Sequence, residues 1–135
     1  MRKFALALMC CVAFGGTSTA SEKPSKEEHP GEVALVEEDG KYLYRRFPSQ
    51  VRLYVYDKDK PGKFGCGEGC INAWPPVWAP DDAKPTGDWT TVDRPERGRK
   101  QWAYKGRPVY TRFHDTATEA TGVGLDKGAW HLLEP

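Results

Sequence analysis

The stretch LYVYDKDKPGKFGCGEGCINAWPP, residues 53–76, decides how this chain folds. Its first four residues alternate aliphatic and aromatic side chains, a pattern typical of a β-strand. Pro61 and Gly62 then favour a tight turn, and the two prolines at residues 75–76 stop any helix that precedes them. The sequence therefore predicts a strand, a turn and a short helix over residues 69–73.

The remaining strand signals predict a mainly β fold, a small α+β domain. Alternating or apolar runs predict strands over residues 32–36, 41–46, 51–56, 89–92, 101–104, 107–110 and 129–133. Lys105 and Gly106 form a two-residue turn signal, so the strands on either side of them are expected to pair as a hairpin. The second and third strands are close enough along the chain to pair in the same way.

Part of the opening stretch recurs near the C-terminus. Each copy has an apolar residue and a tyrosine, then an aspartate after four intervening residues, and each follows an aromatic-x-Tyr segment. Two such units can bury the apolar faces that each would expose alone. We therefore expect two degenerate β repeats packed as one compact domain, with the short helix pinned by a disulfide. The first copy comprises residues 42–44, Leu53, Tyr54 and Asp59, and the second comprises residues 102–104, Val109, Tyr110 and Asp115.

The N-terminus has the features of a secretory signal peptide. Basic residues at positions 2–3 precede an apolar run over residues 4–14, which is too short to span a bilayer. Small residues follow at positions 18–20, as expected before a cleavage site. We expect cleavage after Ala20, so that residues 1–20 are the signal peptide.

This maturation sets the domain boundaries and the charge. Residues 21–31, rich in charge and proline, are expected to form a flexible tail, and residues 32–135 a single two-repeat β domain. Loss of the two basic residues of the signal changes the formal net charge from +1 to −1, which leaves no strong field to attract nucleic acid. Lipidation at Cys10 or Cys11 is the alternative, but the residues before them lack the small side chain that this processing favours.

The motifs of residues 51–135 resemble a bacterial family of secreted repeats, many of them predicted lipoproteins. The first copy fits the Tyr-x-aromatic-x-x-Asp signature, whereas Arg112 stands at the aromatic position of the second copy. The resemblance implies an exported domain, and the family has no established activity to carry over. The residues that match the family motifs are Tyr54, Tyr56, Asp59, Trp74, Pro75, Pro76, Tyr110, Asp115 and Trp130.

Cys66 and Cys70 are predicted to form a disulfide. An exported chain folds in an oxidising compartment, and cysteines four residues apart lie within bonding reach. Closing so short a loop stabilises the fold by about 2 kcal/mol in the chain-entropy description. A redox or metal role is the alternative, although the C-x3-C spacing differs from the C-x2-C of thioredoxin-like enzymes and no histidine neighbours the pair.

Four residues are weak candidates for a metal site. His114 and His131 could meet in space, and with Asp59 or Asp115 they would offer imidazole and carboxylate ligands to a transition metal. Asp57 and Asp59 also fit the first and third positions of a calcium-binding loop, but its fifth position is Pro61, which has no side-chain ligand. Capping of the turn by the two aspartates is the simpler interpretation. No cofactor is therefore expected, with a metal ion as the alternative.

The sequence contains no signature of catalysis. It has no Gly-x-Ser-x-Gly motif and no glycine-rich phosphate loop ending in Lys-Ser or Lys-Thr. We therefore expect a non-enzymatic domain, periplasmic or secreted, that binds an unknown protein or small molecule, but not nucleic acid, and does not insert into the membrane. A periplasmic metal-binding or redox accessory protein is the alternative. An exposed aromatic face would supply contact area to the partner, from Trp74, Trp78, Trp89 and Trp102.

Overall fold

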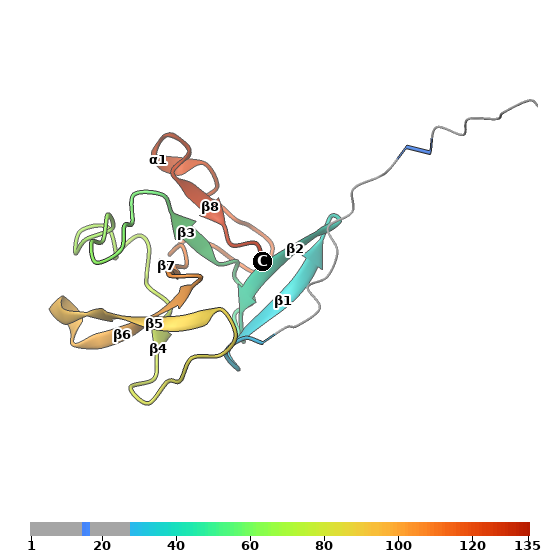
Figure 1. Ribbon diagram of the computed structural model, residues 1–135. Helices are drawn as coiled ribbons and strands as arrows, with labels where there is room; N and C mark the ends of the chain where they lie inside the picture. Colours follow the sequence, from blue (N-terminus) through green and yellow to red (C-terminus); the bar gives the residue numbers. More distant parts are fainter. Residues whose placement is uncertain (1–14, 17–27) are drawn as a thin grey trace, which may run out of the picture.

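The computed structural model describes residues 15–16 and 28–135 (Figure 1). Most of the predicted signal peptide, including Cys10 and Cys11, and tail residues 21–27 lie outside the described residues. At the end of the predicted tail, Pro30 is buried and its carbonyl accepts a hydrogen bond from the Val33 amide, 3.0 Å long. The last residues before the first strand thus lie against the domain.

The described chain is mainly β, as predicted, and its strands form small antiparallel sheets. One sheet pairs β1 with β2, a second pairs β3 with β8, and a third has the order β4-β6-β5 with β7 also paired to β6. A 3₁₀ turn, η1 (Pro95–Arg97), joins β5 to β6, and a single helical turn, α1, precedes β8. The strands are β1 (Val33–Glu38), β2 (Lys41–Arg46), β3 (Tyr54–Tyr56), β4 (Trp78–Ala79), β5 (Trp89–Arg94), β6 (Arg99–Tyr104), β7 (Arg107–Pro108) and β8 (Trp130–Leu132).

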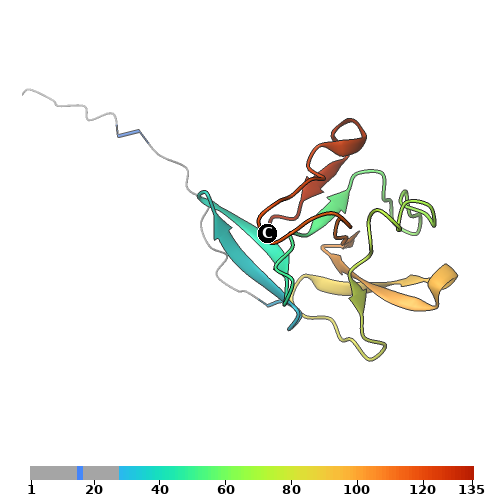
Figure 2. The ribbon, with the colours of Figure 1, turned by 180° about the vertical axis from the view of Figure 1, so that it is seen from behind.

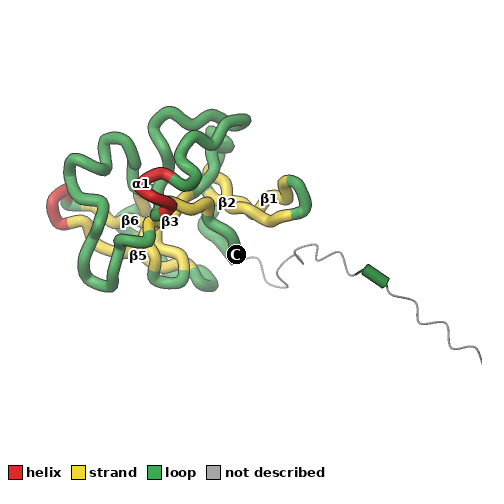
Figure 3. The backbone as a smooth tube through the Cα atoms, turned by 90° about the horizontal axis from the view of Figure 1, so that it is seen from above, coloured by secondary structure: helices red, strands yellow, loops and turns green. Residues whose placement is uncertain are grey.

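The two long hairpins lie on opposite sides of the central pair of strands. Figures 1 and 2 show β1–β2 on one side, β5–β6 on the other, and β3 beside β8 between them. This central pair joins distant parts of the chain, because Tyr56 of β3 faces Trp130 of β8. Figure 3 shows that the strands are short and that long loops connect them. The β3–β8 pair therefore ties the last part of the chain to its middle.

The strand of the opening stretch is buried on both of its faces. Because side chains alternate across a strand, Leu53 and Val55 belong to one apolar cluster and Tyr54 and Tyr56 to another. The four residues are between 0% and 7% exposed. The first cluster also contains residues of both hairpins, and the second contains the disulfide and the tryptophans near β8. This strand thus separates the two apolar clusters and packs one of its faces into each.

The helix predicted over residues 69–73 is wrong, because these residues form a series of hydrogen-bonded turns. Only two amides in this stretch reach back four residues, from Ile71 to Gly67 and from Trp74 to Cys70. Glycine at residues 67 and 69 makes a helix costly here, and the prolines prevent its extension. The one helical turn in the described residues is instead α1 (Leu125–Gly128), which was not predicted, and its central residues Asp126 and Lys127 have left-handed φ angles of 52° and 56°.

Of the two predicted hairpins, one is formed in full and the other only near its turn. β6 and β7 pair around Lys105 and Gly106, as predicted. After β2, the Arg46 amide bonds to the Val51 carbonyl at 2.9 Å, which starts the second hairpin. The chain then turns away, and β3 takes β8 as its partner instead. Strand β4 was not predicted, because two residues are too few to show a periodic pattern.

Candidate functional site

A column of stacked side chains occupies the centre of the molecule. The rings of Trp74 and Trp130 lie 3.6 Å apart with an angle of 2° between their planes. Tyr56 stacks on the far face of Trp130 at 4.1 Å, and the Arg112 guanidinium lies 4.6 Å from the centre of the Trp74 ring. Arg112 thus stacks at one end of the column, and Tyr56 stacks at the other end. Cation–π contact over an indole lets Arg112 stack at the position where the first copy has Tyr56.

Two tyrosines hold this column from the sides. Tyr54 meets Trp74 edge-on at 5.1 Å, and Tyr110 meets Trp130 edge-on at 5.2 Å. The backbones of the two tyrosines bond to each other in both directions, at 2.8 and 2.9 Å. Both side chains are 0% exposed. Edge-to-face geometry is favourable for aromatic pairs, so the column and its two tyrosines form one packed unit.

Each of these tyrosines donates its hydroxyl proton to an aspartate from the other end of the chain. Tyr54 bonds to Asp115 at 2.5 Å, and Tyr110 bonds to Asp59 at 2.8 Å. The pairing is reciprocal. Asp59 follows Tyr54 along the chain but binds Tyr110, and Asp115 follows Tyr110 but binds Tyr54. Burial is the main cause that raises the pKa of each phenol above its ordinary value, and the neighbouring carboxylate raises it further.

The remaining oxygen of each aspartate is also used. Asp59 Oδ1 accepts the Gly65 amide at 2.7 Å, and Asp115 Oδ1 accepts the Thr121 amide at the same distance. Each aspartate therefore closes the loop that follows it while it holds a tyrosine across the molecule. Charge-assisted bonds of this kind are stronger than neutral ones, so both loops are well anchored.

These contacts recur at a constant shift of 56 residues. From the strand of the opening stretch onward, the residues align with those 56 positions later, up to the C-terminus, and the alignment needs no insertion or deletion. It also relates backbone bonds, since the Leu133 amide bonds to Leu53 at 2.8 Å and the Val77 amide bonds to Val109 at 3.0 Å. The related pairs in the site are Tyr54 and Tyr110, Tyr56 and Arg112, Asp59 and Asp115, Gly65 and Thr121, and Trp74 and Trp130.

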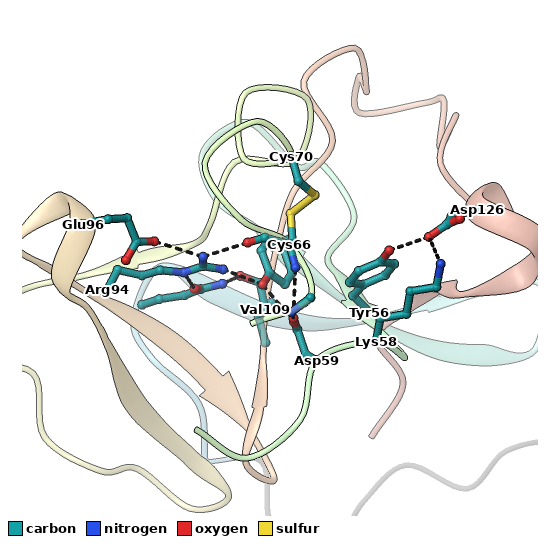
Figure 4. Close-up of a disulfide and its surroundings, with 12 residues drawn as sticks. Tyr56, Lys58, Asp59, Cys66, Cys70, Arg94, Glu96, Val109 and Asp126 are labelled. Carbon is teal, nitrogen blue, oxygen red and sulfur yellow. Dashed lines mark hydrogen bonds and ion pairs between the residues drawn. A yellow bond between two sulfur atoms is a disulfide. The ribbon is translucent and has the colours of Figure 1, made fainter. Parts of the chain in front are cut away.

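Arg94, the last residue of β5, is the centre of a buried hydrogen-bond network that the sequence analysis missed. Its side chain is completely buried, and the Phe64 ring covers the guanidinium at 3.6 Å. Figure 4 shows Arg94 beside the disulfide, with Glu96 on one side and Cys66 on the other. No sequence signal separates this arginine from its exposed neighbours in the basic run. Its acceptors are Gln101 Oε1 at 2.8 Å, the Cys66 carbonyl at 2.8 Å, Glu96 at 3.1 Å and the Tyr110 hydroxyl at 2.6 Å.

The Cys66–Cys70 disulfide is present and lies over this network. The two Cα atoms are 5.1 Å apart. Cys66 is fully buried, its carbonyl accepts the bond from Arg94, and its amide lies 3.4 Å from Asp59 Oδ1. The disulfide therefore fixes the turn that presents these two backbone groups. Pro75 has a comparable backbone role, because its carbonyl accepts the Thr111 amide at 2.9 Å, and Pro76 forms an isolated bridge with Tyr110.

The weak metal candidates are divided between separate places. His131 and Asp57 are in contact at the surface, with 2.6 Å between Nε2 and Oδ2. The other oxygen of Asp57 accepts Arg107 at 2.9 Å, and the bond to His131, followed by Arg107, lowers the pKa of Asp57. Asp59 belongs to the buried Tyr110 pair, and His114 packs its ring against Phe113. Within residues 15–16 and 28–135, no group of three or more His, Cys, Asp and Glu side chains could hold a metal ion.

The predicted aromatic binding face is wrong. Three of its four members are core residues, because Trp74, Trp89 and Trp102 are 5%, 0% and 5% exposed. Trp78 is half-buried and packs against the Arg99 guanidinium at 4.5 Å. The aromatic excess thus fills the two apolar clusters. Period-two alternation in a strand buried on both faces gives no sign of which ring is exposed.

The buried phenols predict a fall in stability in alkali. In the unfolded chain, Tyr54 and Tyr110 titrate near the ordinary pKa of 10.0, whereas the folded state holds their protons above that value. Their contribution is therefore complete below pH 10 and is lost as the pH rises toward the folded pKa. The two phenols together reduce the free energy of unfolding by up to about 2.7 kcal/mol per pH unit in this range.

Denaturant titrations from neutral to alkaline pH measure this fall, with tyrosinate absorbance followed in parallel. The Tyr110→Phe variant should lose about half of the slope that Tyr54 and Tyr110 cause together, because one of these two phenols is gone. Tyr56, whose pKa burial and Asp126 also raise, contributes equally in both proteins. Ionisation of all six tyrosines without loss of the folded signal would contradict the prediction.

A family model matches the C-terminal segment of the chain, which supplies one partner of each repeated contact. Residues 90–134 match the model of a family described as a secreted repeat of unknown function, and this segment includes Tyr110, Asp115 and Trp130. Searches of curated proteins and of solved structures found no match to the chain. In the described residues, no helix has the length and apolarity needed to cross a membrane. The resemblance to a family of exported, secreted repeats is thereby confirmed for residues 90–134.

Proposed function

We propose that this protein is an exported, non-catalytic binding module of two repeats that acts in the periplasm or outside the cell. The observation that carries the proposal is the reciprocal pairing of Tyr54 with Asp115 and of Tyr110 with Asp59. Neither repeat has both partners of a pair, so the repeated polar residues serve assembly of the fold. This leaves partner recognition to the surface.

Burial of the repeated residues supports a non-catalytic role. A catalytic carboxylate must reach substrate with a free oxygen, whereas Asp59 and Asp115 use both oxygens within the protein. The two phenols are fully buried, and their raised pKa values keep them protonated at neutral pH. The two phenols therefore stabilise the core and have no access to a substrate.

A metal-binding or redox accessory role is the second candidate. The contact between His131 and Asp57 favours it, because both side chains are about half exposed and both can ligate metals. Arg107 on the same carboxylate opposes it, since a fixed positive charge repels a cation. The redox form of this candidate would use Cys66 and Cys70.

Elemental analysis of the folded, exported protein separates the two functions. The binding module is expected to carry substoichiometric metal, show no visible absorbance, and keep Cys66–Cys70 oxidised in a glutathione buffer. Stoichiometric metal that is lost in His131→Gln but retained in His29→Gln would reject the proposal in favour of a metal protein. A disulfide that cycles with glutathione would reject it in favour of a redox protein.

A further inference from the structure

An apolar recess lies between the loop before the disulfide, the end of β5 and the β6–β7 hairpin. Its volume is about 570 Å³. The apolar walls are Phe64, Val92 and three prolines, which have no backbone amide to offer. Lys60 and Lys63 stand at its rim. Recesses of this size and composition are the usual sites for small ligands.

The walls of the recess are held in place by the core. The loop is a tight turn in which Lys60 and Lys63 exchange both backbone bonds at 2.9 Å, and Gly62 supplies the positive φ of 71° that this turn needs. Phe64 is fixed from behind, because its ring lies on the buried Arg94 guanidinium. A preformed recess loses little conformational entropy when a ligand binds.

The charge at the rim is positive. Lys60 Nζ reaches only a backbone carbonyl, that of Asp57, at 3.2 Å, and Lys63 makes no ion pair within the described residues. Asp93 also borders the recess, but Lys100 binds it at 3.0 Å. Two ammonium groups are thus left to attract a negative charge placed at the mouth.

The other repeat has a second recess at the corresponding place, and charged side chains contribute to its lining. This second recess, of about 340 Å³, lies at the same place in the first hairpin. There Glu38 binds both Arg45 and Arg52, so ion-paired charges stand beside the apolar side chains of the lining. The fold therefore does not require an apolar recess at this position. The shift of 56 residues relates Gly62, Phe64 and Pro108 of the first recess to Thr118, Ala120 and Arg52 of the second.

We propose that the apolar recess binds a small organic anion with a flat apolar body and one carboxylate. The proposal rests on the proposed function of a binding module and names its ligand class. The body of the ligand lies against Phe64, Val92 and Pro108, and its carboxylate faces Lys60 and Lys63. Apolar contact gives most of the affinity, and the two lysines select the anion.

Titration with 2-naphthoate tests this proposal, followed by calorimetry and by amide shifts of the labelled protein. We expect a Kd of about 1 mM or lower, as for a ligand of this size, with the largest shifts at residues 60–64. The neutral analogue 2-naphthylmethanol should bind more weakly. The Lys60→Gln/Lys63→Gln variant should weaken 2-naphthoate about tenfold and leave the neutral analogue unchanged.

Lys41→Gln is the control, because Lys41 borders the second recess and its loss removes a positive charge away from the apolar recess. It should leave binding unchanged. The proposal fails if 2-naphthoate causes no shifts at the recess, or if it binds no better than the neutral analogue and the double lysine variant has no effect. Such a failure leaves the proposed binding module intact with another ligand, whereas stoichiometric metal would reject the module itself.

Discussion

Replacement of Trp130 by alanine is expected to lower the free energy of unfolding by about 3–5 kcal/mol. Trp130 is 2% exposed and contacts three other aromatic rings, those of Trp74, Tyr56 and Tyr110. Its loss opens a cavity inside the column, between Trp74 and Tyr56. A small domain has only about 5–15 kcal/mol in total, so this variant should be close to unfolding at room temperature. Urea denaturation followed by far-ultraviolet circular dichroism measures the change.

Trp78→Ala is the control for this effect. Trp78 is half-buried and has an arginine rather than a tryptophan as its ring partner, so its loss should cost about 1–2 kcal/mol. If Trp130→Ala fails to fold, Trp130→Phe keeps a ring in the column and should lie between the two. Equal losses for Trp130→Ala and Trp78→Ala would show that the column has no special role in stability.

Replacement of Arg94 by leucine is expected to cost about 3–5 kcal/mol, although leucine is apolar and the site is buried. The substitution leaves the Tyr110 hydroxyl, Gln101 Oε1 and the Cys66 carbonyl without their donor. Buried acceptors without donors are costly because water cannot replace the lost bonds. The same unfolding measurement applies.

Arg97→Leu is the matched control, because Arg97 is exposed and forms a long ion pair with Glu68, at 3.9 Å. It should change stability by less than about 1 kcal/mol. Addition of Gln101→Leu to Arg94→Leu should cost less than the sum of the single changes, since one orphaned acceptor is removed. Additive losses would mean that Arg94 acts by packing and not through its hydrogen bonds.

The strand over residues 41–46 was predictable because its side chains alternate with period two. The hairpin around Lys105 was predictable from its two-residue turn signal, and both are found where expected. The partners of the strands were less predictable, because a pattern of period two does not say which strand lies beside it. β3 could pair with β2 or β8 by its pattern alone, and the structure selects β8.

The register of the two copies shows the same limit. From sequence, residues 42–44 match residues 102–104, which makes Tyr44 equivalent to Tyr104. In the structure, the Tyr44 amide bonds to Leu133 and the Trp102 amide bonds to Val77, and these two acceptors are 56 residues apart. Tyr44 is therefore equivalent to Trp102 in its backbone bonding. The connection after β2 is two residues longer, and a shift of two residues leaves a period-two pattern unchanged.

The candidate site was partly visible in the sequence. Tyr54, Asp59, Tyr110 and Asp115 stand out because they recur, but their exchange of partners depends on how the copies pack. Arg94 could not be found, since a buried arginine is recognised only by the acceptors that surround it. The residues that recur hold the core, and the residues that do not recur form the apolar recess.

The long-range Tyr–Asp bonds determine when this chain can finish folding. Tyr54 and Asp115 are 61 residues apart, and Tyr110 and Asp59 are 51 residues apart. Contacts so distant in sequence form late, because a large loop must close before they contribute. On its own, the first half lacks the acceptor for Tyr54 and the ring that stacks on Trp74. Residues 115–130 therefore complete the core, and a chain cut short before Asp115 loses both the Tyr54 bond and the tryptophan pair.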